Sequence, residues 1–473
     1  AGNMLVVSLK VENARYAEGP MWLGRVLADA RFDAERLRVA AKRMLNDVPN
    51  SKRRSESLMR LAARALQYRD NSAEGAFNVF RVERVLNALL EGEGELQRAV
   101  DELEATRTAL LAAPQAMRAR VAGDVLAVGS SVLEAWSRAP FSEAGGSSSS
   151  ASTVRPALAR ELFASDALKP KAKRTGGCVI TSTSEESNYW LVQSSCISDP
   201  KSPELAPLMV ALEYLTALEG PFWRKIRGKG LAYSYQLSHS LQQGTIKFGL
   251  HKANEPLKAF EEAGAIVAQL CAKDGESGSD EEGEEEPAAG AEDQKEDGGE
   301  EDEDSDGDEI GLDPSALEAA QSGVLFGLIE SVDTVPNAMN VAFEHSIRRL
   351  PPDHLQQLLR AVQAVTKDQV QAALVKHVLP LFDGSRGRMA CLICPAPKRA
   401  KIEEGILALS PPFQCVYLDV GGLAQAMAPS DGFSALRQLV RKAIDEPRGK
   451  KSSAKAKDKT PGKGKGKGKE KGK

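Results

Sequence analysis

The chain has 473 residues, of which 42% are hydrophobic and 27% are charged, and its formal net charge at pH 7 is -4. This length is enough for two or three domains, because a single core rarely grows beyond about 250 residues. No apolar run approaches the roughly 18 to 20 residues that a helix needs to cross a bilayer. The sequence therefore predicts a protein without a membrane partner.

The start of the chain, Ala1-Gly2-Asn3, lacks an initiator Met. It also lacks the basic and apolar pattern of a secretory signal and the Arg-rich amphipathic pattern of a transit peptide. We expect a fragment or a trimmed product, located in the cytoplasm or the mitochondrial matrix rather than secreted.

Residues 1–150 are predicted to form a helix-rich domain, and whether its N-terminus is complete is left open. A short apolar stretch from Met4 to Leu9 is predicted to be a strand. Apolar residues recur at helical spacing in this region, as in Leu58, Leu61, Ala62 and Ala65. Residues 151–175 are predicted to be a linker, which follows the flexible Gly/Ser run from Gly145 to Ser152.

The second predicted domain covers residues 176–447 and mixes strands with helices. Residues 178–181 and 189–193 are rich in β-branched and aromatic side chains, which is typical of strands. Apolar residues alternate over 231–237 and again over 246–250, and this pattern predicts an antiparallel hairpin. An apolar helix is predicted to begin at Pro207.

Helical patterns follow the hairpin, and two more strand patterns close the domain. The predicted helices cover residues 256–271, 314–331, 337–349, 353–365 and 366–378, and the predicted strands cover 389–394 and 414–420. Helices grouped around antiparallel strands, rather than strict β-α-β alternation, predict an α+β layered fold.

Two segments have compositions that cannot form a core. Residues 274–310 carry about twenty acidic side chains and the single base Lys295, and residues 448–473 are rich in Lys and Gly. We expect both to be disordered, as an acidic insert within the second domain and as a basic tail. Binding of nucleic acid by the tail is not expected.

The six cysteines lie in segments that otherwise resemble strands or helices, so reduced core thiols are predicted. The pair Cys391-x-x-Cys394 has the spacing of a redox or zinc motif, but no second pair accompanies it. We predict a buried strand there and keep metal or redox chemistry as the alternative.

The segment Arg227-Gly228-Lys229-Gly230-Leu231-Ala232-Tyr233 joins a helix end to a strand start through two glycines. This junction can bring the guanidinium of Arg227 and the phenol of Tyr233 to one place, where both can donate hydrogen bonds to a peptide carbonyl or an oxyanion. The alternative is an Arg that faces solvent and a Tyr at the edge of the core.

The stretch from Pro207 to Tyr235, with Glu219-Gly220-Pro221-Phe222-Trp223 and the Gly-Leu-Ala-Tyr junction, resembles the C-terminal half of the M16 (insulinase/pitrilysin-like) metallopeptidases. Within that family it is most similar to the presequence-protease-like branch. The similarity extends over most of the chain, including residues 32–37 and 45–54.

This resemblance implies two M16-type α+β domains in this chain, and a second, N-terminal half that encloses a peptide chamber with it. The N-terminal half would carry zinc on His-x-x-Glu-His and a distal Glu. The C-terminal half would supply the substrate-binding residues Arg227 and Tyr233. Peptide and the N-terminal half are the implied partners, in one precursor or as separate subunits.

The zinc motif itself is missing from this sequence. The histidines are His239, His251, His345, His354 and His377, and none of them forms His-x-x-Glu-His. The nearest approach is Glu344-His345, where Val341 stands in the place of the first ligand. We therefore expect no catalytic residue and no metal ligand in this chain, with zinc in the N-terminal half alone.

Three functions remain open. The first is the substrate-binding half of a zinc metalloendopeptidase that degrades peptides. The second is a non-catalytic peptide-binding or assembly subunit of the same fold. The third is a chaperone-like scaffold that binds basic proteins through residues 274–309.

Overall fold

The computed structural model describes residues 5–68, 72, 74, 77–112, 119–129, 131–137, 175–183, 188–272, 311–427 and 434–446. The predicted insert 274–310 and tail 448–473 lie outside the described residues, as does nearly all of the predicted linker 151–175. The predicted division into domains therefore stays a prediction. Within the described residues, no helix is both long and apolar enough to span a membrane.

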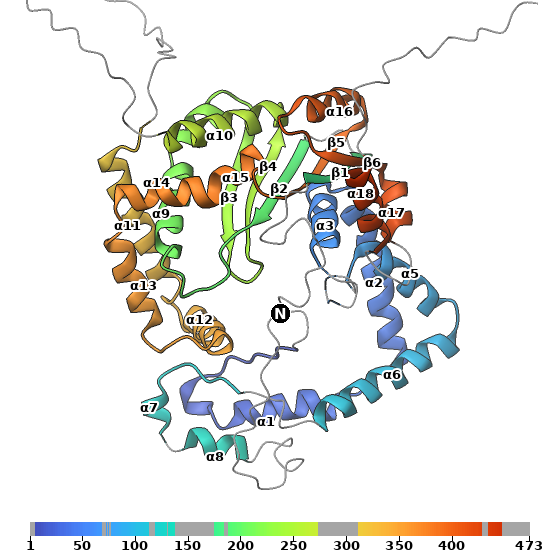
Figure 1. The fold of residues 1–473 in the computed structure, drawn as a ribbon. Coiled ribbons are helices and arrows are strands. Elements are labelled where there is room, and N and C mark those ends of the chain that lie inside the picture. Colours follow the sequence, from blue (N-terminus) through green and yellow to red (C-terminus); the bar gives the residue numbers. More distant parts are fainter. Residues whose placement is uncertain are drawn as a thin grey trace, which may run out of the picture.

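The N-terminal part of the chain is helical, as its periodicity predicts (Figure 1). Asp33 and Asn78 start two of the helices, because their side-chain oxygens accept the backbone N–H groups of Arg36 and Arg81 at 2.9 and 2.8 Å. The elements are η1 (Asn13–Arg15), α1 (Glu18–Gly24), η2 (Arg25–Asp29), α2 (Ala34–Arg53), α3 (Ser55–Gln67), α5 (Val79–Leu90), α6 (Glu93–Leu111), α7 (Val125–Val128) and α8 (Ser131–Ser137).

A six-stranded sheet forms the centre of the second part, with the strand order β3-β4-β2-β5-β1-β6. Its strands are β1 (Thr175–Ser182), β2 (Asn188–Ser195), β3 (Ala232–Ser240), β4 (Thr245–Ala253), β5 (Arg388–Pro395) and β6 (Gln414–Asp419). The six strands predicted in the second domain are confirmed. The strand predicted from Met4 to Leu9 is wrong, because residues 5–9 form no strand in the structure. The predicted hairpin is confirmed too, since β3 and β4 pair antiparallel.

The sheet is mixed, whereas the sequence predicted an antiparallel one. β1 runs parallel to both of its neighbours, β5 and β6. β2 pairs antiparallel with β4 and β5, so the strands β1 and β2, which follow each other in the sequence, are not adjacent. The α+β class is confirmed, and the difference lies in which strands meet.

Each face of the sheet supports a separate core. One core contains Trp190, Phe222, Phe248 and Phe260 and is covered by α9 (Leu205–Thr216), α10 (Pro256–Cys271) and neighbouring helices. The other core contains side chains of α3, α17 (Val420–Met427) and α18 (Ser434–Asp445). In Figure 1, α9 and α10 lie on one side of the strands and α3, α17 and α18 on the other. A helix from the first predicted domain thus completes the core of the second.

The helices predicted after the hairpin are present. Thr366 starts one of them in a capping box with Gln369. Besides α10, the elements are α11 (Pro314–Glu330), α12 (Val335–Arg348), α13 (His354–Gln363), α14 (Lys367–Ala373), η7 (Leu374–Val378), α15 (Leu379–Asp383), η8 (Ala396–Lys398) and α16 (Arg399–Ala408).

Candidate substrate-binding site

The site lies where the chain passes from α9 into β3. After α9, Glu219 has a φ of 60°, and a π-helix, η6 (Trp223–Gly228), then follows. Gly230, with a φ of 65°, allows the tight turn into the strand, because a residue without a Cβ adopts this conformation easily. Backbone hydrogen bonds hold the turn: the N–H of Leu231 donates to the C=O of Ile226 at 2.9 Å, and that of Gly230 to Arg227 at 2.9 Å.

The structure brings together the two predicted site residues. The guanidinium carbon of Arg227 lies 5.5 Å from the centre of the Tyr233 ring, which is the geometry of a cation–π contact. The Tyr233 side chain is 65% exposed. An exposed phenol held against a guanidinium presents two kinds of hydrogen-bond donor to a ligand in solution.

A third residue, Lys252, was not predicted as part of the site. Its ammonium nitrogen lies 5.7 Å from the centre of the Tyr233 ring. Lys252 belongs to β4 and has a φ of 50°, which is uncommon for a residue with a side chain. No local sequence signal marks Lys252, because its neighbour Tyr233 comes from the other strand of the hairpin.

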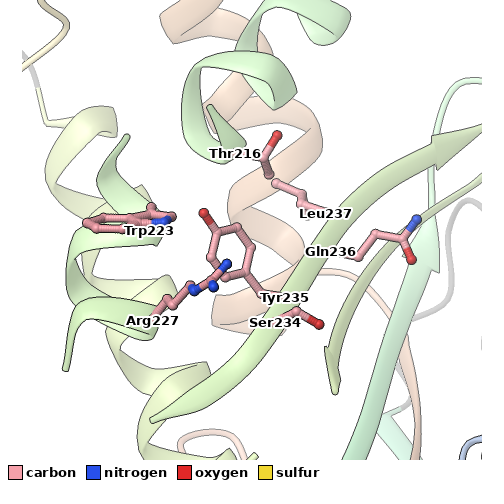
Figure 2. Close-up of a pocket in the computed structure, with 7 residues that line it drawn as sticks. All are labelled: Thr216, Trp223, Arg227, Ser234, Tyr235, Gln236 and Leu237. Carbon is pink, nitrogen blue, oxygen red and sulfur yellow. The ribbon is translucent and has the colours of Figure 1, made fainter. Parts of the chain in front are cut away.

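A pocket of about 320 Å³ opens beside Arg227. Figure 2 shows the side chains of Trp223 and Arg227 directed from η6 toward Tyr235, and the Tyr235 side chain projects from β3. The lining residues are Thr216, Trp223, Arg227, Ser234, Tyr235, Gln236 and Leu237. Sequence reasoning did not include Tyr235 in the site, although the period of two in β3 places it on the same side of the strand as Tyr233.

Tyr235 forms the inner wall of the pocket. Its ring packs edge-on against the buried Phe222, with 5.8 Å between ring centres. Burial raises the pKa of Tyr235, and the positive charge of Arg227 opposes that rise. Tyr235 therefore stays a neutral phenol at physiological pH, able to donate a hydrogen bond.

The described residues contain no group of three or more His, Cys, Asp or Glu side chains placed to hold a metal ion. Glu344 pairs with Arg348 at 3.1 Å, and His345 packs edge-on against His354. His377 lies 2.9 Å from Glu204. Burial lowers the pKa of His345, His354 and His377, which favours their neutral forms.

The Cys391 and Cys394 side chains are buried in β5, as the strand prediction states. Burial raises the pKa of Cys394 to about 11. A thiol with such a pKa is a poor nucleophile at neutral pH. The Sγ atom of Cys391 lies 3.7 Å from that of Cys178, and both are free thiols.

No protein-family model matches the chain. An uncharacterized protein of Schizosaccharomyces pombe is 24% identical over 409 residues, which are 85% of this chain and 35% of that protein. An uncharacterized protein of Saccharomyces cerevisiae is 26% identical over 260 residues, which are 53% of this chain and 24% of that protein. The chain therefore spans about a third or less of the length of these curated relatives.

Among solved structures, the chain is similar to a peptidase M16 inactive domain from Pseudomonas fluorescens, with a TM-score of 0.47 at 14% identity. That match covers 80% of this chain and 74% of the other. Pitrilysin gives a TM-score of 0.47 at 12% identity and covers 90% of this chain and 37% of pitrilysin. One of these structural neighbours is named as an M16 peptidase domain and the other as pitrilysin. The presequence-protease-like branch is not distinguished by them.

Proposed function

We propose that this chain is the peptide-holding half of a two-part zinc peptidase, whose metal-binding half is supplied elsewhere in the same precursor or by another subunit. The observation that carries the proposal is the contact between Arg227 and Tyr233 beside an open pocket. It supports the roles that the family resemblance implies for these two residues.

The arrangement suits the stabilisation of a peptide carbonyl. Arg227 and Tyr235 line the pocket as donors, and the hydroxyl group of Tyr233, whose ring contacts Arg227, is a third donor. An oxyanion that develops during peptide hydrolysis needs donors that are already in place. Stacking against the ring of Tyr233 limits the freedom of the long Arg227 side chain, so less entropy is lost when a ligand binds. The zinc-bound water would come from the other half.

The proposal is tested by hydrolysis of an unstructured peptide by this chain together with a half that carries His-x-x-Glu-His. We expect Arg227→Ala to lower kcat/KM by about a hundredfold, because one oxyanion donor is lost. Tyr233→Phe should lower kcat with little change in KM, since it keeps the ring and removes only the hydroxyl group.

Arg399→Ala is the matched control, because Arg399 makes a similar contact elsewhere, 6.0 Å from the centre of the Tyr417 ring. Its kinetics should equal those of the unaltered chain. Peptide binding without hydrolysis in the combined halves would instead favour the non-catalytic subunit of the same fold. An equal fall in kcat/KM in Arg227→Ala, Tyr233→Phe and Arg399→Ala would contradict the assignment of Arg227 and Tyr233 to the substrate-binding site.

A further inference from the structure

The surface around Tyr233 concentrates positive charge. From residue 218 to residue 232 the chain has four cationic side chains and one acidic side chain, Glu219. Lys252 joins them from β4, so Tyr233 contacts a cation from each side of the hairpin junction. In the part of the chain that the structure describes, neither Arg227 nor Lys252 makes an ion pair or a side-chain hydrogen bond.

The backbone at Lys252 is the second observation. Its φ of 50° falls where pairing between β3 and β4 is interrupted, between Ala232↔Ala253 and Ser234↔His251. A left-handed residue with a side chain costs about 1 kcal/mol or more, and such strain gathers at functional sites. Here it accompanies the placement of one more ammonium group beside a ring that already contacts a guanidinium.

The third observation is the position of β3 at the edge of the sheet. Along its outer side, no strand of the described sheet pairs with its backbone N–H and C=O groups. An extended peptide can add to such an edge through main-chain hydrogen bonds, while its side chains reach neighbouring pockets. This edge suits a peptide better than a nucleic acid, whose backbone offers no strand to pair.

We infer that the Arg227–Tyr233–Lys252 surface selects peptides with an acidic side chain close to the bond that is to be cut. This inference rests on the proposed function and names its substrate class. A carboxylate beside the ring of Tyr233 would accept a charge-assisted hydrogen bond from the guanidinium or from the ammonium group, and would be attracted by both charges. It would also supply the negative charge that the described residues do not offer these two cations.

The test is a binding measurement on the full chain with three fluorescent peptides of one length. One peptide carries a central Glu-Glu pair, the second has Gln-Gln in its place, and the third has Lys-Lys. We expect the Glu peptide to bind about tenfold more tightly than the Gln peptide at low salt, and this ratio to fall as salt screens the charges. The Lys peptide should bind most weakly.

Arg227→Gln and Lys252→Gln should each bring the Glu and Gln peptides closer in affinity. Lys252→Gly should do the same without loss of stability, because glycine accepts the left-handed backbone. Lys398→Gln, which removes an exposed charge in η8, is the control and should keep the ratio. If Lys398→Gln also makes the affinities for the Glu and Gln peptides equal, the inference is overturned.

The remaining outcomes separate the inference from the function on which it rests. Equal affinity for the three peptides would overturn the inference and leave the peptide-holding function intact. Absence of binding by any peptide would count against both. Tighter binding of a single-stranded oligonucleotide than of the Glu peptide would also overturn the inference.

Binding of the chain's own acidic residues 274–309 to this surface is an alternative that a further experiment tests. Zero-length carboxyl–amine cross-linking of the full chain, followed by mass spectrometry, distinguishes them from an added peptide. A cross-link from Lys252 to a residue of this segment within one molecule would overturn the assignment to a peptide from outside. Cross-links from Lys252 to the Glu peptide alone would support it.

Discussion

Lys247 is a charged residue on the sheet face that α3 covers. It lies in β4 opposite Gln193 of β2 and Ser238 of β3. Burial, together with a smaller effect of the charge of Arg64, lowers the pKa of Lys247 from its ordinary 10.5 to about 8. Below pH 8 the folded protein therefore holds a poorly solvated ammonium group.

Replacing this lysine should stabilise the protein. Between pH 8 and 10.5 the unfolded chain binds more protons at this side chain than the folded chain does, so the penalty is full below pH 8 and disappears as the pH rises. We expect Lys247→Met to raise the free energy of unfolding by about 2 kcal/mol at pH 7. Urea unfolding at pH 7 and at pH 10 measures the difference.

Lys258→Met, at an exposed position of α10, is the control for this prediction and should change stability little at either pH. If Lys247→Met raises the free energy of unfolding equally at pH 7 and pH 10, the cause is apolar packing and not the removal of the ammonium group.

At the residue scale, the sequence predicts those side-chain contacts that depend only on the local geometry of the chain. Arg227 and Tyr233 are separated by one glycine turn, so their meeting follows from a junction that can be recognised in the sequence. Lys252 comes to the same ring from another strand, through an irregular backbone that no residue type announces. Trp223 and Tyr235 were present in the predicted elements, but their shared pocket depends on how the π-helix turns.

At the element scale, Gly177 shows why β1 and β5 can lie so close. A Cβ atom at this position would lie 1.9 Å from the carbonyl oxygen of Ala390, its partner in the parallel pair. We expect Gly177→Ala to lower the free energy of unfolding by more than about 3 kcal/mol, because backbone must move to remove the clash. Thermal unfolding followed by circular dichroism measures the loss.

Gly327→Ala is the opposing control within the same experiment. A Cβ atom at Gly327 would have no neighbour within 4 Å, and the residue lies inside α11. Alanine is favoured over glycine in a helix by about 1 kcal/mol, so this variant should be slightly more stable. Similar losses in both variants would contradict the role assigned to Gly177.

Elements and their order in space are not equally predictable. Apolar periodicity and capping residues identify many of the helices and the six strands of the sheet, since these signals act over a few residues. The helices α16, α17 and α18 were not predicted. The parallel pairs of β1 with β5 and β6 join segments that are far apart in the sequence. These strand pairs are selected by packing over the whole sheet. A local sequence pattern therefore does not predict them.

At the scale of the whole molecule, α3 ties the first part of the chain to the sheet. Leu58, Met59 and Leu66 are buried against side chains of β1 and β5. The guanidinium of Arg437 in α18 donates to the backbone carbonyls of Ala65 and Tyr68 at 3.0 and 2.6 Å. The sheet and α3 are therefore parts of one packed unit.

Removal of this helix should expose an apolar face. We expect a chain that begins at residue 175 to bind a hydrophobic dye and to unfold at a lower temperature than the full chain. A chain that lacks only residues 1–32 should keep its unfolding temperature, because those residues contribute to neither core. Equal behaviour of the two truncated chains would contradict the structural role of α3.

The position of α3 also has a consequence during synthesis on the ribosome. Its apolar side chains leave the exit tunnel roughly three hundred residues before β5, the strand against which they pack. Contacts between such distant segments form slowly, and apolar surfaces that wait for them attract other chains. Nascent chains of this protein should therefore depend on chaperones until translation has passed β5.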